Sequence, residues 1–337
     1  MTMWTEMLEQ SAAVAALIEK NQDAIASISR LGTGCTHAVI AARGTSDNAG
    51  RYAQSVWGSR NRLVTGPTLP SLFGVYKKPP SLDGALVIGI SQSGQSPDLV
   101  EVMVEARRQG RPTIGITNHP DSPLADQSDV VVELSAGVEV AVAATKTYTA
   151  QLAAIACISH GLAGEEPTEV KAIPPYLKEV LEGPKISNEI IAPLVDAKTC
   201  VVIGRGFHMA SAYEWSLKLQ ELAQIVAQPF SVAAFLHGPI AAVDPSVPAL
   251  VVVAEGPTYE GVKAVSERLL KSGVTVIAMT DNPSFPASFR IPIPKVPEWL
   301  SPLVAAPALQ MFAHATAIAR GHDPESPRGL SKVTLTH

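Results

Sequence analysis

The first half of the chain contains a hydroxyl-rich turn between two segments of different character. The turn Ser91–Ser96 reads Ser-Gln-Ser-Gly-Gln-Ser; the apolar run Ala85–Ile90 precedes it and the helical pattern Pro97–Ala106 follows it. This order predicts a strand, a turn and a helix. Serine hydroxyls, an amide and backbone N–H groups at the N-terminus of a helix bind an anion without a basic side chain. We therefore expect a phosphate-ester site here; helix capping by Ser96 is a simpler role that is compatible with it.

Three charged residues of the second half share one face of a predicted helix. Glu214, Lys218 and Glu221 are spaced i, i+4 and i+7, and leucines flank them. A carboxylate in a dry site works as a general base when burial raises its pKa toward neutrality. A stripe of this kind can therefore carry a general base, and Lys218 either holds Glu214 or approaches a substrate. The simpler alternative is a solvated stripe with an ordinary Glu–Lys pair.

Composition indicates a globular protein with a sizeable core. The 337 residues favour two domains, and 46% of them are hydrophobic against 17% charged. A net charge of −5 argues against a general nucleic-acid binder, which carries a basic patch. No apolar run approaches the roughly 20 residues of a membrane span, and the N-terminus reads as an amphipathic helix rather than a signal peptide. The cysteines lack metal or redox spacing, and Cys157 and Cys200 read as inert packing residues. We therefore expect a cytoplasmic protein with no membrane partner, no nucleic-acid partner and no metal.

The same α/β unit occurs twice along the chain. Predicted strands recur in three matched pairs: 36–45 with 199–206, 84–90 with 248–254, and 113–118 with 274–282. Strands that alternate with helices imply parallel sheets with right-handed crossovers. The predicted fold class is α/β, with two tandem doubly wound domains, each a mainly parallel sheet flanked by helices, plus an extended C-terminal tail.

The two copies differ in the turn that matters. Where the first copy has Ser91–Ser96, the second has Glu255–Glu260, whose glutamates would repel a phosphate. We therefore expect one phosphate site per chain, in the first domain. The predicted organisation is an N-terminal helical segment, a phosphate-binding first domain, a linker and helix, a second domain, and a tail, over residues 1–34, 35–165, 166–194, 195–320 and 321–337.

Five segments, in this order, resemble one family. They are Arg43–Ser46, Ser91–Ser96, Glu139–Lys146, Glu214–Glu221 with His237–Pro239, and Pro327–Lys332. Together with the repeat, they resemble the tandem form of the sugar isomerase (SIS) domain family. The likeness is to the isomerase half of glutamine:fructose-6-phosphate amidotransferase and to SIS-type glucosamine-6-phosphate deaminases.

The resemblance implies the residues that hold a sugar phosphate. The side chains that match the family's phosphate site are Ser91, Gln92, Ser93, Ser96, Thr45 and Ser46. The residues that match its sugar contacts are Gly44, Val142, Ala143, Glu139 and Glu214. One position departs from the pattern, because Ala144 stands where the family often has a serine, which puts one side-chain contact in doubt.

The resemblance also implies the catalytic residues, namely Glu221, His237, Lys332 and Lys218. The histidine that matches His237 assists opening of the sugar ring and reaches the site from a neighbouring subunit, which implies a homodimer with an active site completed across its interface. The lysine that matches Lys332 contacts the open-chain sugar and can form a Schiff base, for which the amine must be neutral. By itself, a lysine in a tail would be read as a solvated surface charge.

The reaction that this resemblance implies is isomerisation with deamination of an amino-sugar phosphate. The chain begins Met1-Thr2-Met3 and passes directly into the isomerase unit, so we expect no glutaminase domain. Glucosamine 6-phosphate plus water would give fructose 6-phosphate plus ammonia, without a metal or an organic cofactor. The open alternatives are galactosamine-6-phosphate deaminase, a deglycase for phosphorylated fructosamines, a plain phosphosugar isomerase and a non-catalytic sugar-phosphate sensor. The identity of the sugar stays undecided because Phe235 and Leu236 stand just before the histidine, where relatives often carry a charged residue.

Overall fold

The computed structural model describes residues 2–184 and 186–332. In this part of the chain, ten strands form two five-stranded sheets in which every neighbouring pair is parallel. The described residues divide into two compact units. The first-sheet unit comprises residues 9–139, 146–174 and 331–332, and the second-sheet unit comprises residues 2–8, 140–145 and 175–330. The predicted fold class is confirmed, whereas the predicted domain boundaries stay predictions.

The first sheet has the strand order β2-β1-β3-β4-β5. Its strands are β1 (His37–Ala42), β2 (Val64–Pro67), β3 (Ala85–Ile90), β4 (Thr113–Thr117) and β5 (Val130–Glu133). All six positions of β3 are buried, as a strand covered on both faces requires. The chain leaves β1 toward β2 and then returns to place β3 on the other side of β1, so the winding direction reverses between β1 and β3.

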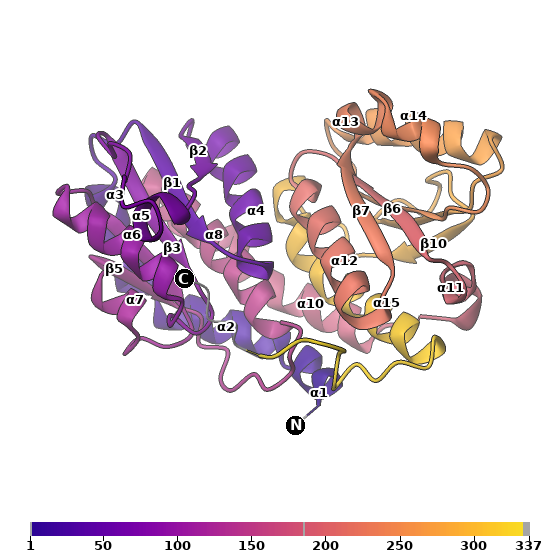
Figure 1. Cartoon of the computed structure of the whole chain (residues 1–337), viewed down its shortest axis with the longest axis horizontal. Helices are drawn as coiled ribbons and strands as arrows, with labels where there is room; N and C mark the ends of the chain where they lie inside the picture. Colours follow the sequence, from indigo (N-terminus) through magenta and orange to yellow (C-terminus); the bar gives the residue numbers. More distant parts are fainter. Residues whose placement is uncertain (1, 185, 333–337) are drawn as a thin grey trace. The chain divides into compact units, whose positions relative to one another are not determined.

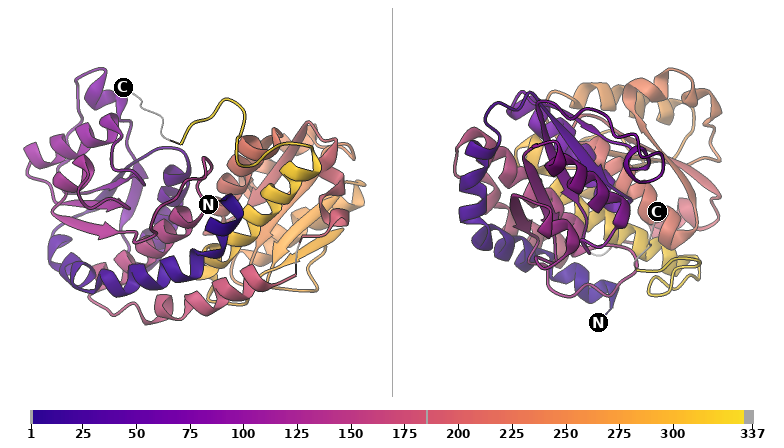
Figure 2. Two further views of the ribbon diagram at one scale, coloured as in Figure 1. Left: turned by 90° about the horizontal axis from the view of Figure 1, so that it is seen from below. Right: turned by 60° about the vertical axis from the view of Figure 1, so that its left-hand side comes forward.

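Helices cover both faces of this sheet (Figures 1 and 2). They are α2 (Gln10–Lys20), α3 (Gln22–Leu31), α4 (Thr45–Arg60), α5 (Ser71–Gly74), α6 (Pro97–Arg108), α7 (Pro123–Asp126), α8 (Lys146–Ala163) and α9 (Thr168–Lys171). Helix α8 packs against α2, α3 and α4 and is buried over its first 16 residues, because it is apolar on nearly every side. The indole Nε1 of Trp57 on α4 donates to the Ile155 carbonyl of α8 at 3.1 Å.

The second sheet repeats the first. Its order is β10-β9-β8-β6-β7, which is the order of the first sheet read from the other end. The strands are β6 (Thr199–Gly204), β7 (Val226–Ser231), β8 (Ala249–Val253), β9 (Val276–Thr280) and β10 (Phe289–Pro292). The predicted strand pairs therefore occupy equivalent positions in the two sheets.

The remaining helices lie in the second-sheet unit, except that α10 begins at Ile173 in the first-sheet unit. They are α1 (Met3–Leu8), α10 (Ile173–Glu182), α11 (Asn188–Val195), α12 (His208–Ala223), α13 (Val232–Leu236), α14 (Tyr259–Lys271) and α15 (Ser301–Ala319), with the 3-10 turns η1 (Pro239–Ala242) and η2 (Glu298–Leu300). Helices α9, α10 and α11 occupy much of residues 166–194, the segment predicted as a linker and helix. Residues 321–332 form no helix or strand, as predicted for the tail.

Helix α15 is the apolar centre of the second-sheet unit. Among the described residues, Glu298–Ala319 is long and apolar enough to cross a membrane by length and composition, yet 78% of its most apolar window is buried inside the structure. The sequence reading found no such run because Pro302, Pro307 and Gln310 interrupt it. The rings of Trp215 on α12 and Phe312 on α15 meet edge to face with centroids 5.2 Å apart. The burial of α15 inside the structure is typical of a core helix.

Two of the cysteines are packing residues, as predicted. Cys157 and Cys200 are fully buried, and burial raises the pKa of each thiol to about 12. Because the thiolate is the reactive form, both side chains are inert in the folded protein.

A buried histidine ties the start of α12 to the start of α15. The Ser301 hydroxyl donates to the Glu298 carbonyl, so it can only accept from His208, whose Nε2 lies 2.8 Å away. Burial lowers the pKa of His208 to about 3, so the ring is neutral at neutral pH. Its Nδ1 atom then accepts from the Ser211 hydroxyl at 3.2 Å.

We expect this histidine to cost stability in acid. Between about pH 6.5 and pH 3, His208 is protonated in the unfolded chain but stays neutral in the folded protein. The free energy of unfolding therefore falls by up to about 1.4 kcal/mol per pH unit as the pH is lowered. His208→Gln should flatten this fall when urea unfolding is measured from pH 7 to pH 4. Substitution of the exposed His119 by Gln is the matched control. Parallel slopes for the wild type and His208→Gln would contradict the assignment.

Candidate active site

Two turns meet at the carboxyl edge of the first sheet. Strands β1 and β3 are paired, with Ala42 opposite Ile90, so the residues that follow them, Arg43–Ser46 and Ser91–Ser96, lie side by side. Each turn leads directly into a helix, α4 or α6. Ligands of open α/β sheets bind where the strand order reverses, which in this sheet is the point between β1 and β3. The fold thus brings together the six side chains predicted to bind phosphate.

The second turn is shaped by its own hydrogen bonds. The Ser91 hydroxyl accepts from the Gly94 N–H at 3.1 Å, and the Ser93 hydroxyl accepts from the Gln95 N–H at 3.2 Å. Gly94 has a φ of +64°, and a Cβ there would lie 2.0 Å from the Ser122 hydroxyl, so no other residue fits without a shift. Ser96 occupies the N-cap position of α6, but its side chain makes no capping hydrogen bond. Simple capping therefore does not explain this serine.

An arginine joins the two turns, and the sequence reading missed this role. The Nε and Nη2 atoms of Arg43 both lie 2.9 Å from Oδ2 of Asp98, in the first turn of α6. Asp98 is buried and Arg43 is half-exposed. The Ser46 hydroxyl of the first turn accepts from Nε2 of Gln151 on α8 at 2.9 Å. The sequence did contain a signal for this ion pair. Arg43 follows β1 and Asp98 lies in the first turn of the helix after β3, and the carboxyl ends of neighbouring parallel strands lie at the same edge of the sheet.

Helix α12 holds a buried ionic cluster. The Lys218 ammonium lies 2.6 Å from Oε2 of Glu221 and 3.3 Å from Oε1 of Glu214. Lys218 and Glu214 are fully buried, and the Glu221 side chain is 20% exposed. Burial alone would lower the pKa of Lys218, but the two carboxylates raise it above its ordinary value. The two neighbouring carboxyl groups therefore keep the buried Lys218 charged, and Glu221 is the member of the cluster that solvent reaches.

The predicted catalytic histidine lies at the other edge of the second sheet. Helix α12 starts after β6 and runs back to the edge where β7 begins, so Glu221 lies five residues before Val226. His237 is exposed and follows β7 and α13 at the carboxyl edge. Six residues of β7 separate the two edges by about 16 Å. Within one chain, His237 and Glu221 are therefore not neighbours.

The tail lysine meets the predicted sugar loop. The Nζ of Lys332 lies 2.6 Å from Oε2 of Glu139. The same carboxylate accepts from the Thr147 N–H at 3.1 Å and from the Thr147 hydroxyl at 2.9 Å, at the start of α8. Lys146, fully buried, forms an ion pair with Glu9. The structure thus brings Glu139 and Lys332 together, as two residues of the predicted site.

The other predicted sugar contacts differ in exposure. Gly44 is exposed at the N-cap of α4, with a φ of +53°. Val142 is half-buried, and Ala143 is buried. Glu214 faces Lys218 from a fully buried position, so any contact of its carboxylate with a sugar would have to reach into the packed face of α12. The roles of these residues stay predictions.

The matching turn of the second sheet contains carboxylates. Glu255, after β8, forms an ion pair with Lys295. The Thr258 hydroxyl donates to Oε1 of Glu298 at 2.7 Å, and a Cβ on Gly256 would lie 2.4 Å from the other oxygen of Glu298.

In the described part of the chain, His, Cys, Asp and Glu side chains form no group of three or more that could hold a metal ion.

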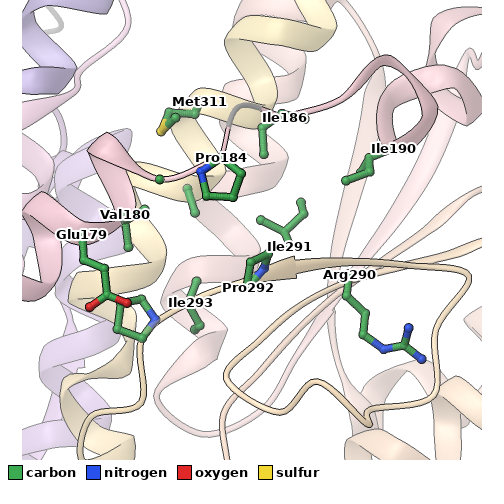
Figure 3. A pocket seen from close by; sticks show the side chains of 13 residues that line it. Glu179, Val180, Pro184, Ile186, Ile190, Arg290, Ile291, Pro292, Ile293 and Met311 are labelled. Atoms are coloured by element: carbon green, nitrogen blue, oxygen red, sulfur yellow. The ribbon is translucent and has the colours of Figure 1, made fainter.

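One well-formed cavity of the second-sheet unit has the wrong chemistry for a sugar phosphate. It measures about 370 Å³ and lies between α10, α11, β10 and α15. Figure 3 shows its lining of isoleucines, prolines and Met311, with Arg290 extending away from them. The Arg290 Nε donates to the Phe285 carbonyl at 2.6 Å. None of the predicted site residues lines this cavity.

We expect Lys218 to be essential for the stability of α12. Lys218→Met would leave two carboxylates buried or half-buried without their cation, at a cost of about 3–5 kcal/mol in the free energy of unfolding. Lys263→Met on α14 is the matched control, since Lys263 pairs with Glu260 at the same i, i+3 spacing but at the surface. Urea unfolding measures both variants. Equal losses would show that the α12 cluster behaves as a surface ion pair.

Comparisons with known proteins agree with this architecture. The family model described as "SIS domain" matches residues 33–160 and 193–319. The chain is 32% identical over 308 residues to glutamine–fructose-6-phosphate aminotransferase [isomerizing] of Thermus thermophilus, covering 87% of this chain and 51% of that protein. The chain thus spans about half the length of the curated relatives it matches.

Two solved structures are similar over nearly the whole chain. The C-terminal domain of glucosamine-fructose-6-phosphate aminotransferase from Francisella tularensis has a TM-score of 0.84 and 26% identity, covering 96% of this chain and 97% of that one. Glucosamine-6-phosphate deaminase from Thermotoga maritima has a TM-score of 0.78 over 98% and 99% of the two chains, and its 19% identity makes this a likeness of fold. With two matched copies that cover most of its length, the chain belongs to the SIS domain family.

Proposed function

We propose that the chain is an SIS-type phosphosugar isomerase that releases ammonia from an amino-sugar phosphate. The specific reaction is glucosamine 6-phosphate plus water to fructose 6-phosphate plus ammonia. The observation that carries the proposal is the Glu221 carboxylate: a buried ammonium holds one of its oxygens, while solvent reaches the group. A fixed carboxylate with one accessible side is what a general base at a carbon atom requires.

The proposed chemistry begins with the open-chain sugar, in which C1 is an aldehyde and C2 carries the amine. Glu221 takes the proton from C2 while the oxygen on C1 gains a proton, which gives an enol amine. Return of that proton from Glu221 to C1 leaves an alcohol at C1 and a protonated imine at C2. Water adds to the imine carbon, the carbon–nitrogen bond breaks with a proton on nitrogen, and fructose 6-phosphate and ammonia leave.

The remaining residues have roles in binding and orientation in this proposal. Ser91, Gln92, Ser93, Ser96, Thr45 and Ser46 would hold the phosphate at the junction of β1 and β3. Gly44, Glu139, Val142, Ala143 and Glu214 would contact the sugar. Lys332 would contact the open-chain sugar, and Oε2 of Glu139, 2.6 Å away, would orient its side chain.

The position of His237 supports a homodimeric enzyme. Ring opening needs a group that exchanges protons near neutral pH, and imidazole is suited to this. Because His237 and Glu221 lie at opposite edges of the same sheet, we propose that His237 serves the active site of a second copy of the chain.

The test is ammonia release from the purified protein with glucosamine 6-phosphate, galactosamine 6-phosphate and a phosphorylated fructosamine. Ammonia from glucosamine 6-phosphate supports the proposal, and ammonia from only one of the others moves the substrate to that sugar. Sugar conversion without ammonia indicates a plain isomerase. Binding without conversion indicates a sensor and overturns the proposal.

We expect Glu221→Gln to abolish turnover without abolishing binding. General-base catalysis contributes about 10²- to 10⁴-fold, so kcat should fall by at least about 100-fold. Calorimetric binding of fructose 6-phosphate should persist. The exposed Glu189 on α11 provides the control substitution, Glu189→Gln. Undiminished turnover in Glu221→Gln would remove this residue from the mechanism.

Replacement of two turn hydroxyls should weaken binding of the phosphate. A hydrogen bond to a charged group contributes about 1.5–3 kcal/mol, so Ser93→Ala with Ser96→Ala should raise KM by at least about 10-fold. Ser81→Ala is the control, because the Ser81 hydroxyl accepts from the Asp83 N–H in a comparable exposed turn. An unchanged KM would place the phosphate elsewhere.

A further inference from the structure

The short helix α1 is firmly fastened to the second-sheet unit. Met3 and Met7 are fully buried, and α1 packs against α15. The ring of Trp4 lies 5.5 Å from the ring of His314 on α15. At the start of the helix, the Met3 N–H donates to both carboxylate oxygens of Glu325, each at 2.9 Å. Helix α1 is therefore a fixed support, held by apolar side chains and by the C-terminal segment.

A buried carboxylate on this helix holds the backbone of the predicted sugar loop. Glu6 is fully buried. Its Oε1 accepts from the Val140 N–H, and the Ala141 N–H lies 3.2 Å from each of its two oxygens. Burying a carboxylate is costly unless hydrogen bonds compensate for the lost water. The compensation here comes from backbone N–H groups of the loop.

The loop depends on such side-chain contacts because residues 140–145 form no helix or strand. At the far end of this stretch, Nε2 of the buried Gln310 on α15 donates to the Thr145 carbonyl at 3.1 Å. Glu6 and Gln310 thus hold the two ends of the segment that contains Val142 and Ala143. Val140 is 57% exposed, so apolar burial of its side chain does not fix that end.

We propose that Glu6 is a positioning residue: its carboxylate sets the backbone of residues 140–143 in the place where it meets the hydroxyl groups of the sugar. This inference rests on the proposed function for its consequence and on the contacts of Glu6 for its geometry. Glu6 touches no substrate in this account. It acts through Val140 and Ala141, and α1 transmits the rigidity of α15 to the loop.

The test compares Glu6→Met and Glu6→Gln with Glu19→Gln, which removes an exposed carboxylate from the neighbouring helix α2. Amide hydrogen exchange of a peptide covering residues 138–144 is the first readout. Loss of a charge-assisted hydrogen bond should raise the equilibrium constant for local opening by about 10-fold or more. Amide exchange at Val140 and Ala141 should therefore accelerate by at least about 10-fold in Glu6→Met. Glu6→Gln keeps one acceptor oxygen and should restore part of the protection.

The second readout is kinetic. Glu6→Met should raise KM for the sugar phosphate by about 10-fold and leave kcat nearly unchanged, with partial rescue in Glu6→Gln. If the wild type turns over no sugar phosphate, the proposed function fails, but hydrogen exchange still decides the role of Glu6. If Glu6→Met unfolds the chain, Glu6→Gln decides: local acceleration at Val140 and Ala141 supports the inference. Unchanged exchange there, or a KM equal to that of Glu19→Gln in an active enzyme, overturns it.

Discussion

A parallel sheet delivers the carboxyl ends of its strands to one edge, and the chemistry of this chain depends on that constraint. Residues 43–46 and 91–96 are more than 40 positions apart along the chain, yet the pairing of Ala42 with Ile90 places their turns together. The helices that follow direct their first N–H groups to the same edge. The ion pair between Arg43 and Asp98 then fixes the spacing between the two turns.

The second sheet uses the same geometry for a different purpose. Its helix α12 crosses from one edge to the other and carries charge into the packed interior, which is tolerated because Lys218 is surrounded by two carboxylates. The two ion pairs of Lys218 fix the side chains of Glu214 and Glu221 on one face of the helix. The cost is that Lys218 and Glu214 cannot be replaced independently of each other.

The sequence was sufficient to predict the repeat, the parallel sheets and the position of the turn Ser91–Ser96 between a strand and a helix. These features follow from local patterns: apolar runs such as Ala85–Ile90, and turns at their ends. The role of Glu6 could not be predicted, because a glutamate in an N-terminal helix reads as a surface charge until its partners, Val140 and Ala141, are known to lie against it. Lys332 was singled out by the resemblance alone, because a lysine in a tail is ordinarily read as a solvated cation. Contacts between residues more than 130 positions apart have no local signature.

Helix α15 shows another limit of local patterns. Pro302 and Pro307 interrupt the apolar run in the sequence, yet both are accommodated in a helix that is buried over most of its length. This helix also follows every strand of its sheet in the sequence. During synthesis, the five strands β6–β10 therefore leave the ribosome before the helix that packs against α12 exists. For that interval the face of α12 that α15 covers stays open to water. The last helix thus sets the period during which the protein is most exposed to aggregation.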